Sequence, residues 1–394
     1  MGSNMAEAHP VGFQWVVEAK ARGAKVIHID PHFTRTSALA DTFVPIRVGS
    51  DIAFLGGVIR HILENGLDFR EYVTAYTNAA ALISPEYRDT EELDGLFSGF
   101  DPETSTYDPA SWQYRATDDP PGPDVPFQAD AHGAGGAPIA SEAEETDTTL
   151  QHPDCVYQIL KRHFARYTPE FVEEVCGVSQ EQFRAVCDAW TANSGRERTT
   201  TLIYSVGWTQ HSVGAQYIRA GSIVQLLLGN IGRPGGGILA LRGHASIQGS
   251  TDIPTLFNLL PGYLPMPSPA TPDLDAYVAS IRSRKQKGFW YAADAYLISL
   301  LKEYWGEGAT ADNDYRFEYL PRIDGDHGVF RTALDMVEGK VPGYFLFGQN
   351  PAVAVSNGRL MRLAMAQLDW MVVRDLAMIE TATFWKDAPE VETG

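Results

Sequence analysis

Apolar and polar positions follow each other in blocks that predict short buried strands separated by amphipathic helices. Residues 11–24, "VGFQWVVEAKARGA", place apolar side chains at helical spacing after Pro10, and this helix is expected to end at Gly23. The next segment, "KVIHID", is a short predicted strand that ends in an acid, and "TFVPIRV" is a second one. Residues 52–65 form a further helical pattern, which Gly66 ends. This alternation predicts an α/β fold, with a parallel sheet and helices on its faces.

The same alternation returns later in the chain. Helical patterns occupy "CVYQILKRHFARY" and "SQEQFRAVCDAWTANS", and "TTTLIYSVGW" has the pattern of a buried strand before the apolar helix "VGAQYIRAGSIVQLLLGNIG". A late α/β segment consists of the strand "GYFLFGQNP", a helix around "SNGRLMRLAMAQL" and the strand "DWMVVRD". Residues from about 100 to 152 interrupt the pattern, because they are rich in Pro, Gly, Asp and Glu with weak periodicity. We expect a surface insertion there, part of it mobile.

Two segments repeat one motif. "GSNMAEAHP" begins at Gly2 and "GQNPAVAVS" begins at Gly348, and each has Gly-x-Asn, small residues, a helix and a strand that ends in an acid. The spacing is similar: 30 − 4 = 26 positions from Asn4 to Asp30, and 375 − 350 = 25 from Asn350 to Asp375. A Gly-containing turn lets backbone N–H groups approach a phosphate, and an acid at the strand end accepts hydrogen bonds from a ribose or a purine. The repeat predicts two copies of a nucleotide-binding unit.

Composition excludes several classes of protein. Apolar content of 44% and charged content of 21% are typical of a globular chain, and no apolar run is long enough to span a membrane. The net charge of −19 argues against a nucleic-acid partner. The three cysteines lack the spacing of a zinc site, so we expect no metal ligands in this chain. No strand precedes Gly2, so we expect that Met1 is not the natural start of the domain.

The segment "LRGHASIQG", residues 241–249, places a permanent cation and a titratable ring among glycines, after a run that has the pattern of buried backbone. From the local sequence alone, Arg242 is either part of an anion site or a structural Arg that pairs with an acid. His244 is either a functional group or a packing His held by one neutral hydrogen bond.

Several motifs together resemble one family. "GSNMAEAHP", "VIHIDPHFTRTSALAD", "SVGWTQHSVGAQYIRAGSIVQLLLGNIGRPGGG", "LRGHASIQGSTD" and "LFGQNPA" look like the catalytic subunit of molybdopterin-dependent formate dehydrogenases of the respiratory or periplasmic type. The resemblance covers nearly the whole chain except the acidic insertion. It implies two related Rossmann-like doubly wound domains of the molybdopterin oxidoreductase fold, incomplete at both ends, over residues 1–244 and 245–394. Each would hold one molybdopterin guanine dinucleotide of a shared molybdenum or tungsten centre.

The resemblance also implies site residues where the motifs match. Arg242 would hold formate, because a guanidinium is planar, bidentate and always charged, and His244 would orient an oxygen or relay a proton. The residues expected to bind the cofactor are, for the first dinucleotide, Asn4, Glu7, Asp30, Pro31, Gly49 and Asp51; on the pterin side, Val206, Gly207, Gln210 and Gly243; and for the second dinucleotide, Gly348, Gln349, Asn350, Arg374, Asp375 and Thr381.

The rest of the family's machinery is expected outside this chain. The Cys motif for a [4Fe–4S] cluster and the selenocysteine or cysteine beside the metal would precede Met1, so the chain would be an internal fragment that is inactive alone. A selenocysteine codon taken as a stop would explain such a start. The implied partners are an iron–sulfur beta subunit and a membrane cytochrome b, in periplasmic anaerobic respiration. The alternatives are a cofactor-binding scaffold without turnover, another molybdopterin oxidoreductase, or an NAD-dependent dehydrogenase, which the lack of G-x-G-x-x-G disfavours.

Overall fold

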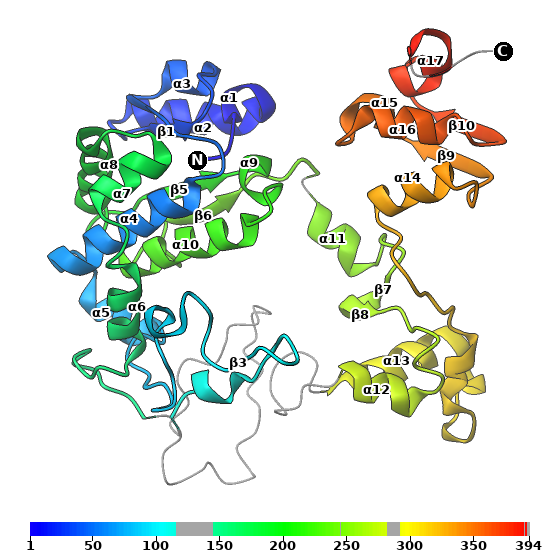
Figure 1. Cartoon of the computed structure of the whole chain (residues 1–394), viewed down its shortest axis with the longest axis horizontal. Coiled ribbons are helices and arrows are strands. Elements are labelled where there is room, and N and C mark those ends of the chain that lie inside the picture. The colour runs from blue at the N-terminus through cyan, green and yellow to red at the C-terminus, as the bar shows by residue number, and fades with distance from the viewer. Residues whose placement is uncertain (116–144, 245, 282–291, 390, 392–394) are drawn as a thin grey trace. The chain divides into compact units, whose positions relative to one another are not determined.

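Parallel strand pairs carry the fold, as the alternating pattern predicts. The computed structural model describes residues 1–115, 145–244, 246–281, 292–389 and 391, and the chain forms two units, Met1–Gln248 and Gly249–Gly394 (Figure 1). The α/β prediction is confirmed, because each unit has parallel strands that are joined through helices. The parallel pairs are β1 (Ile27–Asp30) with β2 (Thr42–Pro45) and β5 (Thr201–Tyr204) with β6 (Gly237–Ala240) in unit 1, and β9 (Gly343–Phe347) with β10 (Trp370–Arg374) in unit 2.

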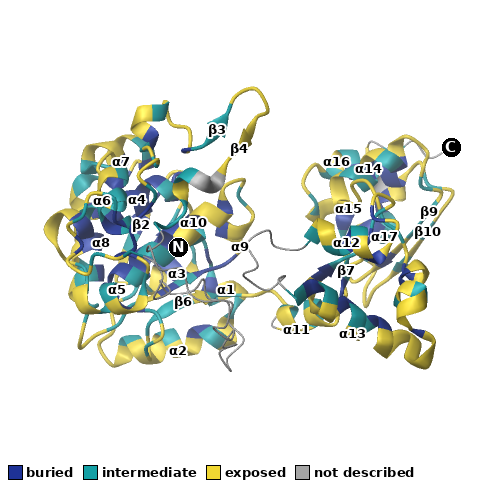
Figure 2. Ribbon diagram, turned by 90° about the horizontal axis from the view of Figure 1, so that it is seen from below, coloured by how far each residue is buried: buried dark blue, intermediate teal, exposed yellow. Residues whose placement is uncertain are grey.

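In unit 1, α4 (Asp51–Asn65) packs against α6 (Val156–Phe164), α7 (Pro169–Cys176), α8 (Gln180–Ala192) and α10 (Gly214–Leu227), and its inner face lies in the core. Gly66 ends α4 in the left-handed region at φ 62°, as the sequence predicts. Figure 2 shows the buried positions of α4 and α10 inside this unit and exposed positions on its outer helices. The helices are α1 (Met5–Ala8), α2 (Pro10–Ala21), α3 (Arg35–Leu39), α4 (Asp51–Asn65), α5 (Arg70–Tyr76), α6 (Val156–Phe164), α7 (Pro169–Cys176), α8 (Gln180–Ala192), α9 (Val206–Thr209) and α10 (Gly214–Leu227).

Unit 2 has two hydrophobic cores. One lies around α12, α13 and the 3₁₀ segment 311–319, and the other lies between β9, β10 and the helices α14, α16 and α17. The helices are α11 (Ile247–Asp252), which begins at the end of unit 1, α12 (Leu274–Ile281), α13 (Ala293–Trp305), α14 (Val329–Val337), α15 (Pro351–Ala354), α16 (Gly358–Met365) and α17 (Glu380–Asp387). Each unit also has a short antiparallel pair. In unit 1 it is β3 (Phe100–Asp101) with β4 (Thr106–Tyr107), and in unit 2 it is β7 (Leu259–Leu260) with β8 (Leu264–Pro265).

The two faces of the β9–β10 pair differ. Leu346 is buried, and Met371 and Val373 pack with it in the second core. The alternate positions, Phe345 and Trp370, are exposed, and their rings meet at 5.0 Å. Successive side chains of a strand point to opposite faces, so one face of this pair packs on helices and the other is aromatic and open to solvent.

The predicted insertion is more ordered at its ends than its composition indicates. Residues 116–144 of this insertion lie outside the described residues. The flanks form isolated bridges, Ala81 with Thr146 and Leu82 with Cys155, and Leu150 and Cys155 are fully buried. Of residues 145–152, Leu150 alone is buried, so this part lies at the surface as expected apart from that one side chain. Apolar residues at Leu150 and Cys155 pack into the core of unit 1 despite their polar neighbours.

Candidate functional site

In unit 1, the Gly-x-Asn turn is held by a chain of hydrogen bonds. Gly2 has a left-handed φ of 59°, and α1 begins directly after Asn4. The Thr36 hydroxyl donates to Asn4 Oδ1 at 2.9 Å and accepts from the Ala6 amide at 3.0 Å. Asn4 Nδ2 donates to the Glu7 carboxylate at 2.6 Å, and this bond lowers the pKa of Glu7. The oxygen and the nitrogen of the Asn4 side chain are thus each bonded to another residue of unit 1.

Unit 2 builds the same arrangement from a different part of the chain. Gly348 has a φ of 63°, and α15 begins directly after Asn350. The Thr381 hydroxyl donates to Asn350 Oδ1 at 2.7 Å and accepts from the Ala352 amide at 3.1 Å. Asn350 Nδ2 donates to Glu380 at 2.6 Å and lowers the pKa of that carboxyl. The repeat in the sequence is therefore also a repeat in local geometry, down to the amide two residues after the Asn.

The sequence missed two members of this repeat, Thr36 and Glu380. A signal for Thr36 exists: it lies six positions after Asp30 (36 − 30 = 6), and Thr381 lies six positions after Asp375 (381 − 375 = 6). Glu380 had no such signal. Its partner residue in unit 1, Glu7, lies on α1, whereas Glu380 begins α17.

The two acids end their strands as predicted. Asp30 is the last residue of β1, and Asp375 directly follows β10. Asp30 Oδ1 accepts from the His32 amide at 2.9 Å, and Asp375 Oδ1 accepts from the Leu376 amide at 2.7 Å. Asp30 Oδ2 lies 3.7 Å from His28 Nε2, and both acids stand at the carboxyl edge of a parallel pair, where such sheets bind ligands. Their neighbours Pro31, Arg374 and Gln349 are exposed.

Trp208 joins three of the predicted loops of unit 1. Its indole N–H donates to Asp51 Oδ1 at 2.9 Å, and both side chains are buried. Burial raises the pKa of Asp51, although the indole bond opposes the shift. A Cβ added to Gly2 would meet Trp208 at 2.6 Å, and one added to Gly207 would meet the Gly2 carbonyl oxygen, also at 2.6 Å. The turn of Gly2, the start of α4 and the α9 loop are therefore packed as one block.

The segment with Arg242 lines a groove of unit 1 with a volume of about 250 Å³. Arg242, Gly243 and His244 are exposed, although the run before them has the pattern of buried backbone. The reason is that β6 ends at Ala240 and the chain then leaves the sheet, so the glycines mark a loop. Of the predicted pterin-side residues, Val206 and Gly243 line the groove. Gly207 and Gln210 are exposed but do not line it. The groove is lined by Tyr204, Ser205, Val206, Thr209, Ala240, Leu241, Arg242, Gly243, His244 and Ile247.

His28 ties the Gly2 turn to β1 through its bond to the Ser3 backbone. The Ser3 carbonyl can only accept, so Nε2 carries the hydrogen of the neutral ring and Nδ1 accepts from the Ser37 hydroxyl at 2.8 Å, while Ser37 Oγ also accepts from the Thr34 amide at 2.8 Å. Nε2 then donates to the Ser3 carbonyl at 3.0 Å. The ring is buried, and burial lowers its pKa. The neutral tautomer with hydrogen on Nε2 is the one that satisfies both bonds.

Acidification is expected to weaken this turn. The folded ring titrates below the ordinary His pKa of about 6.5, so between these two values the unfolded chain binds more protons and stability falls as the pH falls. Hydrogen exchange of the peptide covering residues 2–9 measures this at pH 7.5 and 5.5. His28→Gln, which keeps an N–H donor without titrating, is expected to reduce the pH dependence. Equal pH dependence in the two proteins would assign the effect to other groups.

The turn also has an unsatisfied group that fits a polar ligand. Ser3 Oγ is buried and has no hydrogen-bond partner among the described residues. A Cβ built on Gly49, Gly243 or Gly348 would meet nothing within 4 Å, so the backbone at these positions is open to a ligand. Together with an acid at each strand end, these features fit a phosphate-linked nucleotide better than a metal ion. Among the described residues there is no group of three or more His, Cys, Asp or Glu side chains that could hold a metal.

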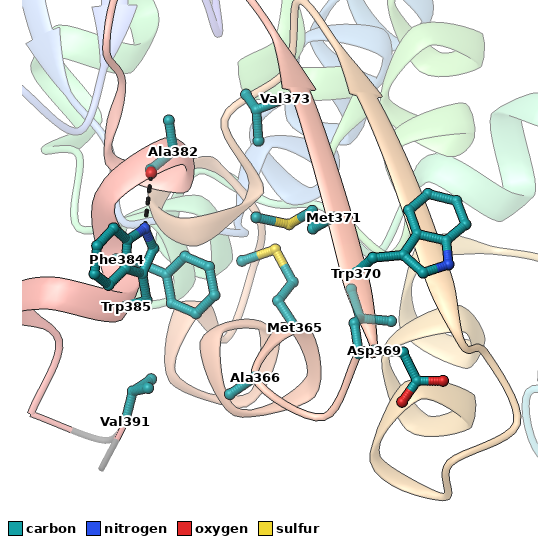
Figure 3. Close-up of a pocket in the computed structure, with 11 residues that line it drawn as sticks. Met365, Ala366, Asp369, Trp370, Met371, Val373, Ala382, Phe384, Trp385 and Val391 are labelled. Carbon is teal, nitrogen blue, oxygen red and sulfur yellow. Dashed lines mark hydrogen bonds between the residues drawn. The ribbon is translucent and has the colours of Figure 1, made fainter. Parts of the chain in front are cut away.

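A second pocket, in unit 2, has a different character. It has a volume of about 510 Å³, and Met365, Met371 and Phe384 point towards one another beside β10 (Figure 3). Asp369 is the one ionisable residue of its described lining. Such a pocket lacks the donors that a phosphate needs.

No helix in the described part of the chain has both the length and the apolar content to cross a membrane.

Comparison with known proteins places the chain in a family. Residues 1–384 match the molybdopterin oxidoreductase family. The chain is 42% identical over 395 residues to the major subunit of the nitrate-inducible formate dehydrogenase of Escherichia coli (strain K12), with 99% of this chain and 36% of that protein covered. It is also 42% identical over 392 residues to formate dehydrogenase 2 subunit alpha (cytochrome c-553) of Nitratidesulfovibrio vulgaris, with 98% and 36% covered.

The chain spans about a third of the length of these relatives, 36% in each case. Among solved structures, acetylene hydratase from Pelobacter acetylenicus aligns with 94% of this chain and 37% of its own, at a TM-score of 0.44 and 14% identity. The family match extends from the Gly2 turn through the Asn350 turn to Phe384, and so includes both copies of the repeat. The chain belongs to the molybdopterin oxidoreductase family.

Proposed function

We propose that this chain is part of the catalytic subunit of a formate dehydrogenase, which oxidises formate to carbon dioxide, a proton and two electrons. The duplicated Asn turn carries the proposal, because two matching turns are what a centre held by two dinucleotides requires. The identity of 42% to formate dehydrogenase subunits along 99% of the chain supports formate as the substrate. Alone, the turns would suit any enzyme with two nucleotide ligands.

The cofactor in this proposal is bis-molybdopterin guanine dinucleotide with molybdenum or tungsten. In unit 1, the open backbone around Asn4 and Gly49 would receive one dinucleotide, and Asp30 would accept hydrogen bonds from its ribose or guanine. In unit 2, Gly348 and Asp375 would act likewise. Val206, Gly207 and Gln210 would contact the pterin side. When bound, the metal and its sulfur or selenium ligands supply the two-electron chemistry.

Arg242 is proposed to bind the formate carboxylate. Its guanidinium lines the groove together with His244 and Val206, and formate is small enough for a groove of about 250 Å³. Two parallel N–H···O bonds hold a carboxylate in one orientation, so the C–H bond can be directed to one side. The fixed charge neutralises the anion without accepting its proton. His244 would then orient an oxygen or accept the proton released.

The remaining parts of the assembly are proposed from the relatives. One unit would hold each dinucleotide, with domains over residues 1–244 and 245–394. A [4Fe–4S] cluster and a selenocysteine or cysteine ligand would belong to the longer subunit. Electrons would pass to an iron–sulfur beta subunit and a membrane cytochrome b, in the periplasm.

The proposal is tested on the full-length subunit purified without oxygen. Metal is measured by mass spectrometry, guanine nucleotide is measured after hydrolysis, and formate-dependent reduction of a viologen dye is followed. We expect molybdenum or tungsten, two guanine nucleotides per metal, and turnover with formate. Metal and nucleotide without formate turnover would indicate another molybdopterin oxidoreductase. Guanine nucleotide without metal or turnover would indicate a binding scaffold.

A further inference from the structure

Two threonines occupy equivalent places in the two units. Thr36 and Thr381 each use a hydroxyl twice, to donate to the Asn oxygen and to accept from the amide two residues after that Asn. Thr36 is 6% exposed and Thr381 is fully buried. A buried hydroxyl with both capacities satisfied is costly to lose, because its partners would be left unpaired.

Each hydroxyl connects the turn to the segment that carries the acid. Thr36 is the second residue of α3, which follows Asp30 at the end of β1, and Thr381 is the second residue of α17, which follows Asp375 after β10. The bond from Thr36 to Asn4 spans 32 positions of the chain, and the bond from Thr381 to Asn350 spans 31. The bond therefore fixes the distance between the turn, which would meet the phosphates, and the acid, which would meet the nucleoside.

The Asn side chains are already occupied in this arrangement. Asn350 Oδ1 accepts from both the Thr381 amide, at 3.1 Å, and the Thr381 hydroxyl, and its Nδ2 donates to Glu380. An amide oxygen has two lone pairs, so this one is fully used. The Asn350 oxygen therefore acts on the ligand through the backbone that it holds in place, while these bonds use only one of the two Nδ2 hydrogens.

We infer that Thr36 and Thr381 are paired positioning residues, which hold each Gly-x-Asn turn at a set distance from its acid so that a guanine dinucleotide meets preformed backbone. This inference rests on the proposed function for its ligand. The bond to the turn itself is independent of any ligand and is tested separately. Neither threonine touches the reacting atoms.

The test compares Thr36→Val with Thr36→Ser, and Thr381→Val with Thr381→Ser, in the full-length subunit. Valine keeps the shape and removes the hydroxyl, whereas serine keeps the hydroxyl. Hydrogen exchange of the cofactor-free protein is followed in peptides covering residues 2–9 and 349–355, with α8 and α14 as references. We expect the valine variants to exchange about tenfold faster at Ala6 or Ala352, the loss of one buried hydrogen bond, with the references and serine variants unchanged.

Guanine nucleotide retained by the purified protein is the second readout. The valine variants should lose most of the nucleotide of the altered unit, about half of the total, and the serine variants should keep it. Unchanged exchange at Ala6 and Ala352 overturns the inference, and so does exchange that rises equally in α8 or α14, because the hydroxyl would then serve general stability. Faster local exchange with full nucleotide content also overturns it. Failure of the proposed function is distinct, since the wild-type protein itself would then contain no guanine nucleotide.

Discussion

Replacing Trp208 with alanine is expected to lower the free energy of opening of unit 1 by about 3–5 kcal/mol, the cost of deleting a large buried aromatic side chain. The indole is fully buried, stacks on Tyr204 with 5.3 Å between ring centroids and meets Tyr217 edge-on at 6.4 Å. Its loss also leaves the buried carboxylate of Asp51 without the indole donor. Hydrogen exchange of the slowest amides of α4 measures the free energy of opening.

Two variants make the Trp208 experiment specific. Trp15→Ala is the matched control, because Trp15 is 69% exposed on α2 and should change the stability by less than about 0.5 kcal/mol. Trp208→Phe keeps most of the volume and removes the N–H, so about 1–3 kcal/mol is expected from the unpaired Asp51 oxygen. If Trp208→Ala and Trp15→Ala cost the same, the packing of the three loops around this indole would not stabilise the unit.

Replacing Arg242 with lysine is expected to lower formate turnover in the full-length subunit by about 10²–10³-fold, the range for losing one preorganised donor at a reacting anion. Lysine keeps the charge but cannot form the two parallel bonds of a guanidinium. Metal and guanine nucleotide should remain at wild-type levels, because Arg242 is exposed on the groove and lysine keeps its positive charge. Dye reduction with formate, together with metal and nucleotide analysis, checks each part.

The control for Arg242 is Arg22→Lys, a substitution on an exposed side chain beside Glu18 at the end of α2, which should leave turnover unchanged. Equal kcat/KM for Arg242→Lys and wild type would remove Arg242 from substrate binding. A fall in metal or nucleotide content in step with activity would instead assign the residue to holding the centre together.

Local sequence signals predicted the helices and strands, but they did not predict contacts between distant parts of the chain. Gly66 ends α4 as expected, because a left-handed residue stops a helix wherever it occurs. The Gly-x-Asn repeat was visible because its spacing lies within one strand–helix unit. Thr36 shares this local spacing, six positions after Asp30, but the bond that gives it a role spans 32 positions, and the indole bond of Trp208 to Asp51 spans 157.

For the Arg242 segment, the local pattern itself was ambiguous. A glycine-rich run after an apolar helix has the composition of buried backbone and also that of a loop leaving a sheet, and the sequence cannot distinguish the two. The site therefore divides into a part fixed by spacing, the two turns and their acids, and a part fixed by packing, the Trp208 block and the groove.

The open face of β9 and β10 has a consequence for how this chain behaves in solution. Phe345 and Phe347 stack at 6.2 Å, and Trp370 and Val372 continue the same exposed face. A net charge of −19 makes two copies repel each other at long range, while contact between two such faces would hide aromatic surface from water. Added salt screens the first effect and leaves the second, so we expect high ionic strength to favour contact between these faces.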